Sequence, residues 1–303
     1  ARDIHGPNPP WEGGFSVVGK PQRKPDGLSK ATGEAVYTDD IQLPGMLHAK
    51  TLRSPHPHAR IKSIDVSKAL AMPGVHAAIT GRDLPARYGV IPWTEDETAL
   101  AVDKVRFVGD PVAAVAAVDE DTATRALDAI VVEYEALHAF LPPEDSLANA
   151  EPKIHEDKKN NVSKHVLLDF GDVDGAMAGA DVVLEGEFGF HSTTHAAIEP
   201  HCAVARLSPD GVLTVWSATQ ITHYVHRALA KVLGLPEQQI RVIQPCLGGA
   251  FGGKSDPFSL EFCAAKLAMV TGRPVKMLYT REEVFYAHRG RHATRPAPRR
   301  TAG

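Results

Sequence analysis

The sequence has few cysteines and no long apolar run, and these absences exclude several classes of protein. Its three cysteines, Cys202, Cys246 and Cys263, are scattered over 303 residues. They form no CxxC pair and no set with zinc-ligand spacing, so neither a disulfide framework nor a zinc or iron–sulfur site is predicted. We expect buried, reduced thiols in a cytoplasmic protein. No apolar run is long enough to span a bilayer, and the first residues lack the apolar core of a secretory signal.

The chain also lacks a strong charge of either sign. Its 33 Lys and Arg against 37 Asp and Glu leave a formal net charge of -4. Such a chain has no overall field that would attract nucleic acid or an anionic membrane, so neither is predicted as a partner. Hydrophobic residues make up 43% and charged residues 23%, which is ordinary for a globular protein, and the length suits two domains.

Composition and periodicity divide the chain into five parts. Residues 1–26 are rich in glycine and proline and are predicted to form an extended arm. Residues 27–142 alternate strand patterns with short helices, and the polar stretch 143–161 is interpreted as a linker. Residues 162–292 again mix strands with helices, so the expected fold class is α+β. Residues 293–303 form a basic tail.

The basic end of the chain admits three interpretations. Residues 289–303 contain five arginines, two prolines and no acidic residue. A disordered tail, an interruption of the natural sequence and a nucleic-acid-binding arm all fit this composition, although one short tail on an acidic chain offers little affinity for phosphates.

Local patterns predict the individual elements of the two larger parts. Alternation and apolar runs predict strands, 3.6-residue periodicity predicts helices, and Ser208-Pro209-Asp210-Gly211 is a strong hairpin turn. The predicted strands are 46–52, 61–66, 75–80, 112–118, 131–134, 182–190, 203–207, 212–217, 240–243 and 275–279, and the predicted helices are 67–72, 119–130, 172–180, 223–233 and 259–270.

The most informative segment is the glycine-rich loop QPCLGGAFGGK, from Gln244 to Lys254. Glycines let a backbone approach a ligand closely, and the helix expected after the loop adds a positive N-terminal dipole, so an oxyanion or phosphate cradle is plausible. Gly248 to Ser255 also fits the spacing of a P-loop, which would place Lys254 on a nucleotide phosphate. Two features disfavour that alternative: the loop lies late in the chain, and no acidic strand end follows it.

Five ordered blocks resemble the molybdenum-binding subunits of the xanthine dehydrogenase and aldehyde oxidase family. They are DGLSKATGEAVYTDDIQLPGMLHAKTLRSPHPHARI, DKVRFVGDPVAAVAA, THAAIEPHCAVA, SATQITHY and LGGAFGGK, and they extend from residue 27 to about residue 292. The resemblance implies an α/β hammerhead domain over residues 27–142 and the first part of a molybdopterin-binding α+β domain over residues 162–292. The runs GVIPWTEDETALAVDKVRFVGDPVAAVAAVDE and TREEVFYAHRGR are similar to the large subunit of 4-hydroxybenzoyl-CoA reductase, which implies reductive dehydroxylation of an aromatic acyl-CoA. Nicotinate-dehydrogenase-like and aldehyde-oxidising members share many of the same blocks, so a heteroaromatic or aldehyde substrate is the alternative.

The same resemblance assigns roles to particular residues. Gln220 matches the family glutamine whose amide donates to a molybdenum oxo ligand, and a neutral amide donor leaves the metal charge unchanged. Ser255 stands where purine-oxidising members carry a substrate-contacting glutamate, so it is the expected substrate-binding residue and xanthine is disfavoured as substrate. Glu199 matches a family glutamate and is expected to pair near the site. The expected cofactor contacts, besides Gln220, are Gly249, Ala250, Phe251 and Gly252, with Gly253 helping to hold the loop.

The remaining implications concern groups outside this sequence. The family's catalytic glutamate is expected beyond residue 303, so no catalytic residue is assigned here, and the metal is expected to be held by the pterin and not by the histidines between His191 and His226. The implied cofactors are molybdenum-molybdopterin, with cytosine dinucleotide as the expected form, and 2Fe-2S and FAD on partner subunits. The expected partners are therefore an iron–sulfur subunit, an FAD subunit, the remainder of the large subunit and a small-molecule substrate. A P-loop nucleotide-binding protein and a non-catalytic assembly piece are the alternatives.

Overall fold

A computed structural model describes residues 17, 20–21, 23–89, 95–141, 143–287, 289–294 and 299–302. Contacts divide the chain into two units, Ala1–Val36 and Tyr37–Gly303. In the first unit, helix α1 (Gly27–Thr32) ends at Gly33, whose φ of 80° is the left-handed conformation that commonly terminates a helix. The predicted arm, residues 1–26, lies largely outside the described residues.

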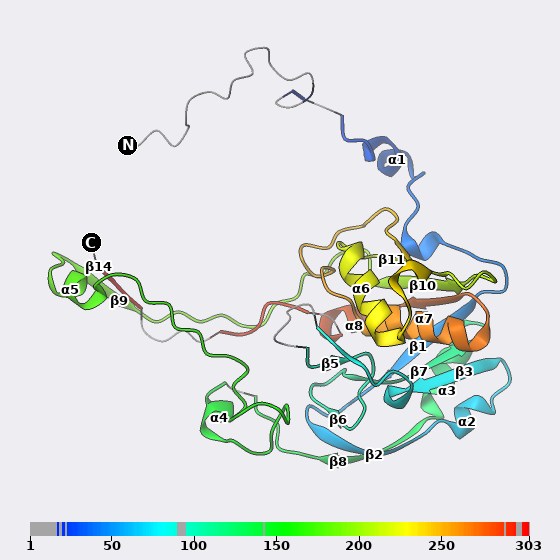
Figure 1. Cartoon of the computed structure of the whole chain (residues 1–303), viewed down its shortest axis with the longest axis horizontal. Coiled ribbons are helices and arrows are strands. Elements are labelled where there is room, and N and C mark those ends of the chain that lie inside the picture. The colour runs from blue at the N-terminus through cyan, green and yellow to red at the C-terminus, as the bar shows by residue number, and fades with distance from the viewer. Residues whose placement is uncertain are drawn as a thin grey trace. The chain divides into compact units, whose positions relative to one another are not determined.

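One seven-stranded mixed sheet organises the second unit (Figure 1). Its order is β12-β11-β10-β13-β1-β7-β3, so strands from both larger sequence regions form the same sheet. The junction is the parallel pair β1 and β13, in which Leu47 lies opposite Val275. The strands are β1 (Leu47–Arg53), β3 (Val75–Thr80), β7 (Pro111–Ala117), β10 (Cys202–Leu207), β11 (Leu213–Ser217), β12 (Ile240–Ile243) and β13 (Val275–Leu278).

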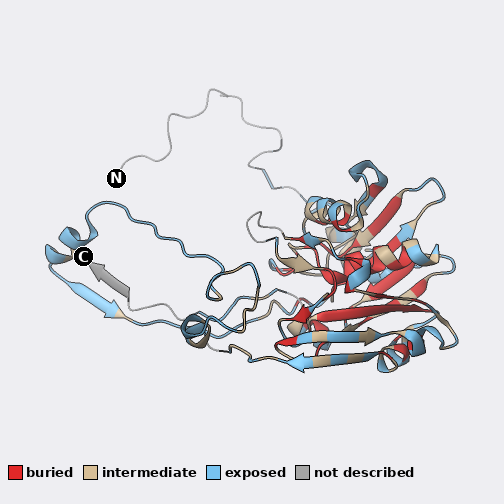
Figure 2. Ribbon diagram, turned by 60° about the horizontal axis from the view of Figure 1, so that its bottom comes forward, coloured by how far each residue is buried: buried red, intermediate tan, exposed pale blue. Residues whose placement is uncertain are grey.

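Strand β7 shows why this sheet can be covered on both faces. All seven of its residues are buried, and side chains alternate between the two faces of a strand. Ala114 and Ala116 belong to the large core cluster formed with helix α7 (Ser259–Thr271), whereas Ala113 and Val115 pack in a second cluster with helix α3 (Glu120–Asp128). Small side chains in β7 let both helices approach closely, and Figure 2 shows this buried interior in red.

Shorter elements complete the second unit. A three-stranded sheet has the order β6-β2-β8, and β4 pairs with β5. The remaining strands are β2 (Ala59–Asp65), β4 (Arg87–Tyr88), β5 (Glu97–Thr98), β6 (Lys104–Val105), β8 (Val131–Ala136), β9 (Val183–Gly186) and β14 (Arg299–Ala302); the α-helices are α2 (Ser67–Leu70), α4 (Pro143–Ala148), α5 (Val173–Ala178), α6 (Thr222–Leu233) and α8 (Arg281–Tyr286); and the 3-10 helices are η1 (Thr38–Asp40), η2 (Gly81–Asp83) and η3 (Glu237–Gln239).

Most of the predicted elements are confirmed within one or two residues. The predicted hairpin is the antiparallel pair β10–β11, and helix α3 begins after Asp119, whose side chain accepts from the Thr122 N–H as an N-cap. The predicted strand 182–190 is shorter than expected, because the strand covers only Val183–Gly186 and Phe190 forms an isolated bridge with Thr294. Part of the basic tail forms β14, which is antiparallel to β9.

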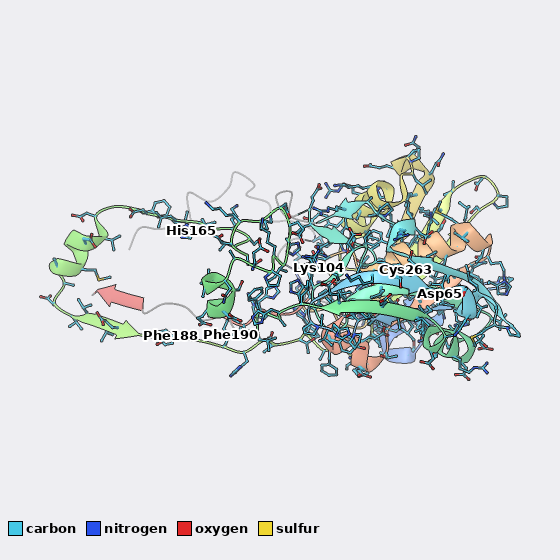
Figure 3. All side chains as sticks on the ribbon, turned by 90° about the horizontal axis from the view of Figure 1, so that it is seen from below. Asp65, Lys104, His165, Phe188, Phe190 and Cys263 are labelled. Carbon is cyan, nitrogen blue, oxygen red and sulfur yellow. The ribbon has the colours of Figure 1, made fainter. Side chains whose placement is uncertain are left out.

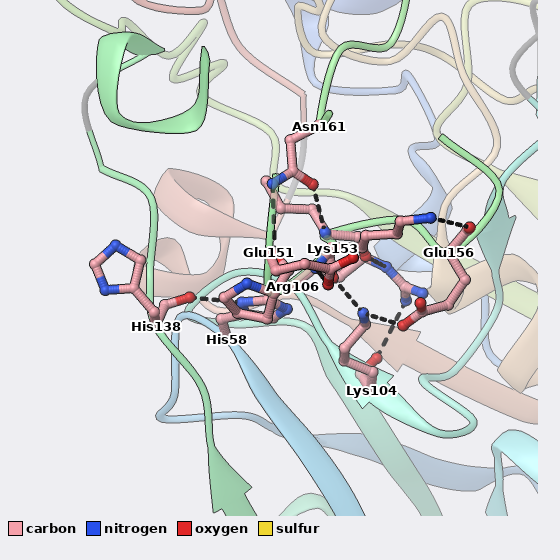
Figure 4. A network of polar contacts seen from close by, with 10 residues as sticks. His58, Lys104, Arg106, His138, Glu151, Lys153, Glu156 and Asn161 are labelled. Atoms are coloured by element: carbon pink, nitrogen blue, oxygen red, sulfur yellow. Dashed lines mark hydrogen bonds and ion pairs between the residues drawn. The ribbon is translucent and has the colours of Figure 1, made fainter. Parts of the chain in front are cut away.

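The stretch interpreted as a linker, residues 143–161, is bound to strand β6 by hydrogen bonds (Figure 4). The Lys104 ammonium donates to the Lys153 carbonyl at 2.6 Å and to a Glu156 carboxylate oxygen at 2.7 Å, and the Arg106 Nε donates to the Ile154 carbonyl at 2.9 Å. Lys104 is 5% exposed at its side chain. The contacts that fix this stretch are thus polar and involve its backbone, which is why apolar periodicity does not reveal them.

Residues 162–190 expose an unusual number of large apolar side chains. Figure 2 shows this segment almost entirely as exposed, and Figure 3 labels Phe188 and Phe190 on it. Exposed apolar side chains this numerous and close in sequence are uncommon on the surface of a monomeric protein. The exposed set is Val162, Val166, Leu167, Leu168, Phe170, Val173, Val182, Val183, Leu184, Phe188 and Phe190.

Candidate functional site

The glycine-rich loop connects β12 to α7 and has a backbone that few other residues could adopt. Gly249 and Gly252 have φ values of 101° and 90°, and Phe251 has a φ of 56°, which is uncommon for a residue with a side chain. A Cβ at Gly248 would lie 2.6 Å from the Cβ of Glu199. The glycines therefore permit both the left-handed turns and the close approach of the neighbouring segment.

Gln220 lies directly against this loop, although 32 residues separate it from Gly252 in sequence. Its side-chain oxygen accepts from the Gly252 N–H at 3.1 Å, the Lys254 N–H at 3.3 Å and the Ser255 hydroxyl at 3.2 Å. Its backbone N–H donates to the Lys254 carbonyl at 2.8 Å. Backbone N–H groups only donate, so the amide oxygen faces the loop and the amide NH2 faces away from it. This arrangement presents a neutral hydrogen-bond donor at the surface of the site.

Phe251 and the loop amides form the rest of this surface. Phe251 is 76% exposed, whereas Ala250, in the same loop, is buried. Within the described residues, the N–H groups of Gly249, Ala250 and Phe251 have no hydrogen-bond acceptor. Consecutive backbone amides without acceptors are suited to an anionic or hydrogen-bonding ligand, and an exposed aromatic ring beside them is suited to an apolar or planar one.

Lys254 does not reach into this site. The P-loop alternative would place it on a nucleotide phosphate, but its side chain is 1% exposed and its ammonium donates to a Glu199 carboxylate oxygen at 2.7 Å. Helix α7 begins only at Ser259, so Lys254 is not at a helix N-terminus either. A P-loop requires a lysine that contacts the nucleotide phosphates, and the geometry therefore argues against the P-loop alternative. The expected pairing of Glu199 near the site is observed.

A buried carboxyl connects the strand before Gln220 to the helix after the loop. Glu261, in the first turn of α7, accepts from the Ser217 hydroxyl at 2.8 Å and from the Phe258 N–H at 2.9 Å. Burial raises the pKa of Glu261 to about 7, and both hydrogen bonds oppose that rise. Sequence reasoning missed Glu261; its only local signal is a position three residues after the N-cap Phe258, which suits a capping box.

Two other side chains that sequence reasoning left without a role also support the loop. His201 is buried, and its Nε2 lies 3.2 Å from the Gly253 carbonyl oxygen. The His195 ring lies so close that a Cβ at Gly253 would be 2.7 Å from its Nδ1. Within the described residues, no group of three or more His, Cys, Asp or Glu side chains is arranged to hold a metal ion.

A large cavity of about 940 Å³ is lined by other residues. Its described lining includes Tyr88, Glu97, Tyr286 and Arg289 but neither Gln220 nor any residue of the glycine loop. Arg289 already forms ion pairs with Glu97 and Asp256. The cavity is therefore separate from the surface formed by Gln220 and Phe251.

Family models match both larger regions of the chain. Residues 32–138 match the a/b hammerhead domain of aldehyde oxidase and xanthine dehydrogenase, and residues 154–297 match a molybdopterin cofactor-binding domain. In the described part of the chain, no helix is both long and apolar enough to cross a membrane. The two matches together identify a hammerhead domain followed by a molybdopterin cofactor-binding domain.

Individual known proteins are also similar to this chain over nearly its whole length. The nicotinate dehydrogenase large molybdopterin subunit of Eubacterium barkeri is 41% identical over 92% of this chain and 65% of its own length, and the xanthine dehydrogenase molybdenum-binding subunit of Escherichia coli O157:H7 is 36% identical over 88% and 37%. Quinoline 2-oxidoreductase from Pseudomonas putida 86 superposes with a TM-score of 0.80 at 32% identity, over 88% of this chain and 35% of its own. The aldehyde oxidoreductase of Desulfovibrio gigas gives 0.79 at 31% identity, over 88% and 31%.

The chain belongs to the xanthine dehydrogenase and aldehyde oxidase family, whose members are molybdenum hydroxylases, a class of oxidoreductases. It spans 65% of the length of the nicotinate dehydrogenase subunit and about a third of the other relatives named above. The expected α+β fold, with a hammerhead domain followed by molybdopterin-binding structure, is confirmed.

Proposed function

We propose that this chain provides the first part of the molybdenum-cofactor site of a molybdenum hydroxylase, with Gln220, Gly249, Ala250, Phe251 and Gly252 in contact with the molybdopterin. The observation that supports this most strongly is the orientation of the Gln220 amide. Three donors hold its oxygen against the loop, so its NH2 group is fixed in position before any ligand arrives. A fixed neutral donor beside unpaired backbone amides is what an oxo ligand and a polar pterin require.

The cofactor and the residues of this chain would have different roles in the site. A bound molybdenum–pterin group would supply the two-electron chemistry, which no side chain in the site can perform. The Gln220 NH2 would donate a hydrogen bond, and the Phe251 ring would restrict the space next to it. The amides of residues 249–251 would orient the bound group without adding charge. The catalytic glutamate expected from the family would come from polypeptide outside these residues.

We further propose that the substrate is an electron-poor nitrogen heteroaromatic compound of the nicotinate or quinoline type. Relatives with these names match over nearly the whole chain. Ser255 would contribute to the substrate side of the site. Its hydroxyl is neutral and donates to Gln220, so the site carries no negative charge at this position. The expectation of a 4-hydroxybenzoyl-CoA substrate gains no support from these relatives.

The exposed apolar segment 162–190 supports the proposal that further polypeptide completes the protein. Phe170 and Leu167 are 81% and 80% exposed, which is costly in water unless another surface covers them. We propose that the remainder of the large subunit covers this segment, and that iron–sulfur and FAD subunits carry electrons in the same assembly. Molybdopterin cytosine dinucleotide is the proposed cofactor form, and the three unpaired thiols are compatible with a cytoplasmic setting.

The proposal is tested by metal analysis of the complex purified through a tag on this chain. We expect molybdenum and a releasable pterin nucleotide in the wild-type complex, together with iron, and reduction of an artificial electron acceptor with nicotinate or quinoline as substrate. Gln220→Leu should retain the cofactor less well and lose at least ten-fold in turnover, whereas Gln239→Leu, at an exposed position in η3, should change neither.

Two results would overturn the proposal. The first is a complex without molybdenum that nevertheless contains all its subunits, which would favour a non-catalytic assembly role. The second is full activity and full molybdenum content in Gln220→Leu, which would remove Gln220 from the cofactor site.

A further inference from the structure

A single carboxylate oxygen accepts hydrogen bonds from both ends of the segment GGAFGGK within the glycine-rich loop. The Oε2 atom of Glu199 accepts from the Gly248 N–H at 2.9 Å and from the Lys254 ammonium at 2.7 Å. The Glu199 N–H in turn donates to the Gly248 carbonyl at 3.3 Å. Gly248 and Lys254 are the first and last residues of the segment GGAFGGK, so Glu199 closes this segment into a fixed arc.

This ion pair lies in the protein interior. The Lys254 side chain is 1% exposed and the Glu199 side chain is 10% exposed. Burial lowers the pKa of Lys254, and the hydrogen bond that its ammonium donates to Glu199 opposes that change. A buried ion pair is often no more stabilising than a well-packed apolar pair of the same size. Stability alone is therefore a poor reason for placing two charges here, and the geometry of the loop is a better one.

The segment that carries Glu199 is itself anchored from another helix. Arg281, the first residue of α8, donates through Nη1 to the Ala197 carbonyl at 2.7 Å and through Nη2 to the Ile198 carbonyl at 2.5 Å. Its guanidinium thus binds two consecutive carbonyls directly before Glu199. The arc is consequently attached to the folded core through α8 and not only through its own sequence neighbours.

We infer that Glu199 and Lys254 are a positioning pair, which holds the loop in the conformation that presents Phe251 and the 249–251 amides before any ligand binds. Neither side chain faces the site, so they act only through the loop. The identity of the ligand that these groups would contact rests on the proposed function. The fixed conformation of the loop does not depend on it.

Amide hydrogen exchange of the loop, followed by mass spectrometry, tests this inference in the 303-residue chain. Glu199→Gln keeps an oxygen that can accept from Gly248 and Lys254 but removes the countercharge of Lys254. For Glu199→Gln we expect a lower melting temperature than that of wild type. The exchange rate of the 247–256 peptide should stay within about three-fold of wild type. The double variant Glu199→Leu with Lys254→Met replaces the ion pair by apolar groups. We expect a melting temperature within a few degrees of wild type and at least ten-fold faster exchange of that peptide.

Matched variants keep the test decisive if the double variant does not fold. Gly248→Ala leaves both charges in place but forces a Cβ against Glu199, and it should accelerate exchange of the same peptide. Lys62→Met with Glu135→Leu removes an ion pair that is about half exposed on both sides, and it should leave the loop unchanged. Loop exchange equal to wild type in a folded Glu199→Leu/Lys254→Met or Gly248→Ala variant would overturn the inference.

Molybdenum content of the corresponding complexes gives the second readout. It should fall in the Glu199→Leu/Lys254→Met variant and stay near wild type in Glu199→Gln. If the wild-type complex contains no molybdenum, the proposed function fails, but the exchange experiment still decides whether the pair positions the loop.

Discussion

Glu261 makes the stability of this protein depend on pH in a way that can be calculated. Its carboxyl is fully buried between Ser217 and the start of α7, and its pKa is raised from 4.5 to about 7. A carboxyl with a raised folded-state pKa favours the folded state below its unfolded pKa, and this contribution is lost as pH rises through the folded pKa. The wild-type protein should therefore become less stable between about pH 5 and pH 8.

The size of this effect follows from the two pKa values. One pKa unit corresponds to about 1.4 kcal/mol, so ionising Glu261 in the folded protein costs about 3 kcal/mol in total. Most of that, about 2 to 3 kcal/mol, falls between pH 5 and pH 8. Glu261→Gln keeps an oxygen that can accept from the Phe258 N–H and gains an NH2 group that can donate to the Ser217 hydroxyl oxygen, but it cannot ionise, so it should remove this part of the pH dependence.

Urea unfolding at several pH values between 5 and 8 measures the effect. The free energy of unfolding of wild type should fall by about 2 to 3 kcal/mol more than that of Glu261→Gln over this range. Ser217→Ala should steepen the wild-type dependence, because it removes a donor that favours the ionised carboxyl. Glu282→Gln, at an exposed position in α8, serves as the control. Parallel pH profiles for wild type and Glu261→Gln would refute the reasoning.

Three further predictions concern the core, the exposed segment and the loop. Leu267→Ala in α7 removes a fully buried side chain and should lower the free energy of unfolding by about 2 to 5 kcal/mol in urea titrations, whereas Val270→Ala, at an exposed position of the same helix, should change it far less. Phe170→Asp should weaken co-purification of the partner polypeptide without lowering the melting temperature of this chain, and unchanged recovery of the partner would contradict the docking proposal. Gly253→Val should place a side chain against His195 and lower molybdenum content in the complex, and an unchanged content would count against that contact.

Much of the fold could be predicted from local sequence patterns. A strong turn signal between two apolar runs predicted the β10–β11 hairpin, and apolar periodicity with a terminal glycine predicted α6. These predictions succeed because strand and helix periods report which side chains are buried. The pattern could not predict that β1 pairs with β13, more than 200 residues away, because strand pairing depends on the packing of the whole sheet.

The candidate site, too, could be predicted from the sequence only in part. The glycine loop and Gln220 were recognised from the sequence, because their spacing and residue types resemble a family pattern, and the structure brings the two together. The direction in which the Gln220 amide points was decided only by tertiary structure, since it depends on which backbone N–H groups fold against its oxygen. Lys254 was the opposite case. Its sequence context suits a phosphate ligand, but the fold buries it against Glu199, because a countercharge supplied from 55 residues away outweighs any local preference for solvent.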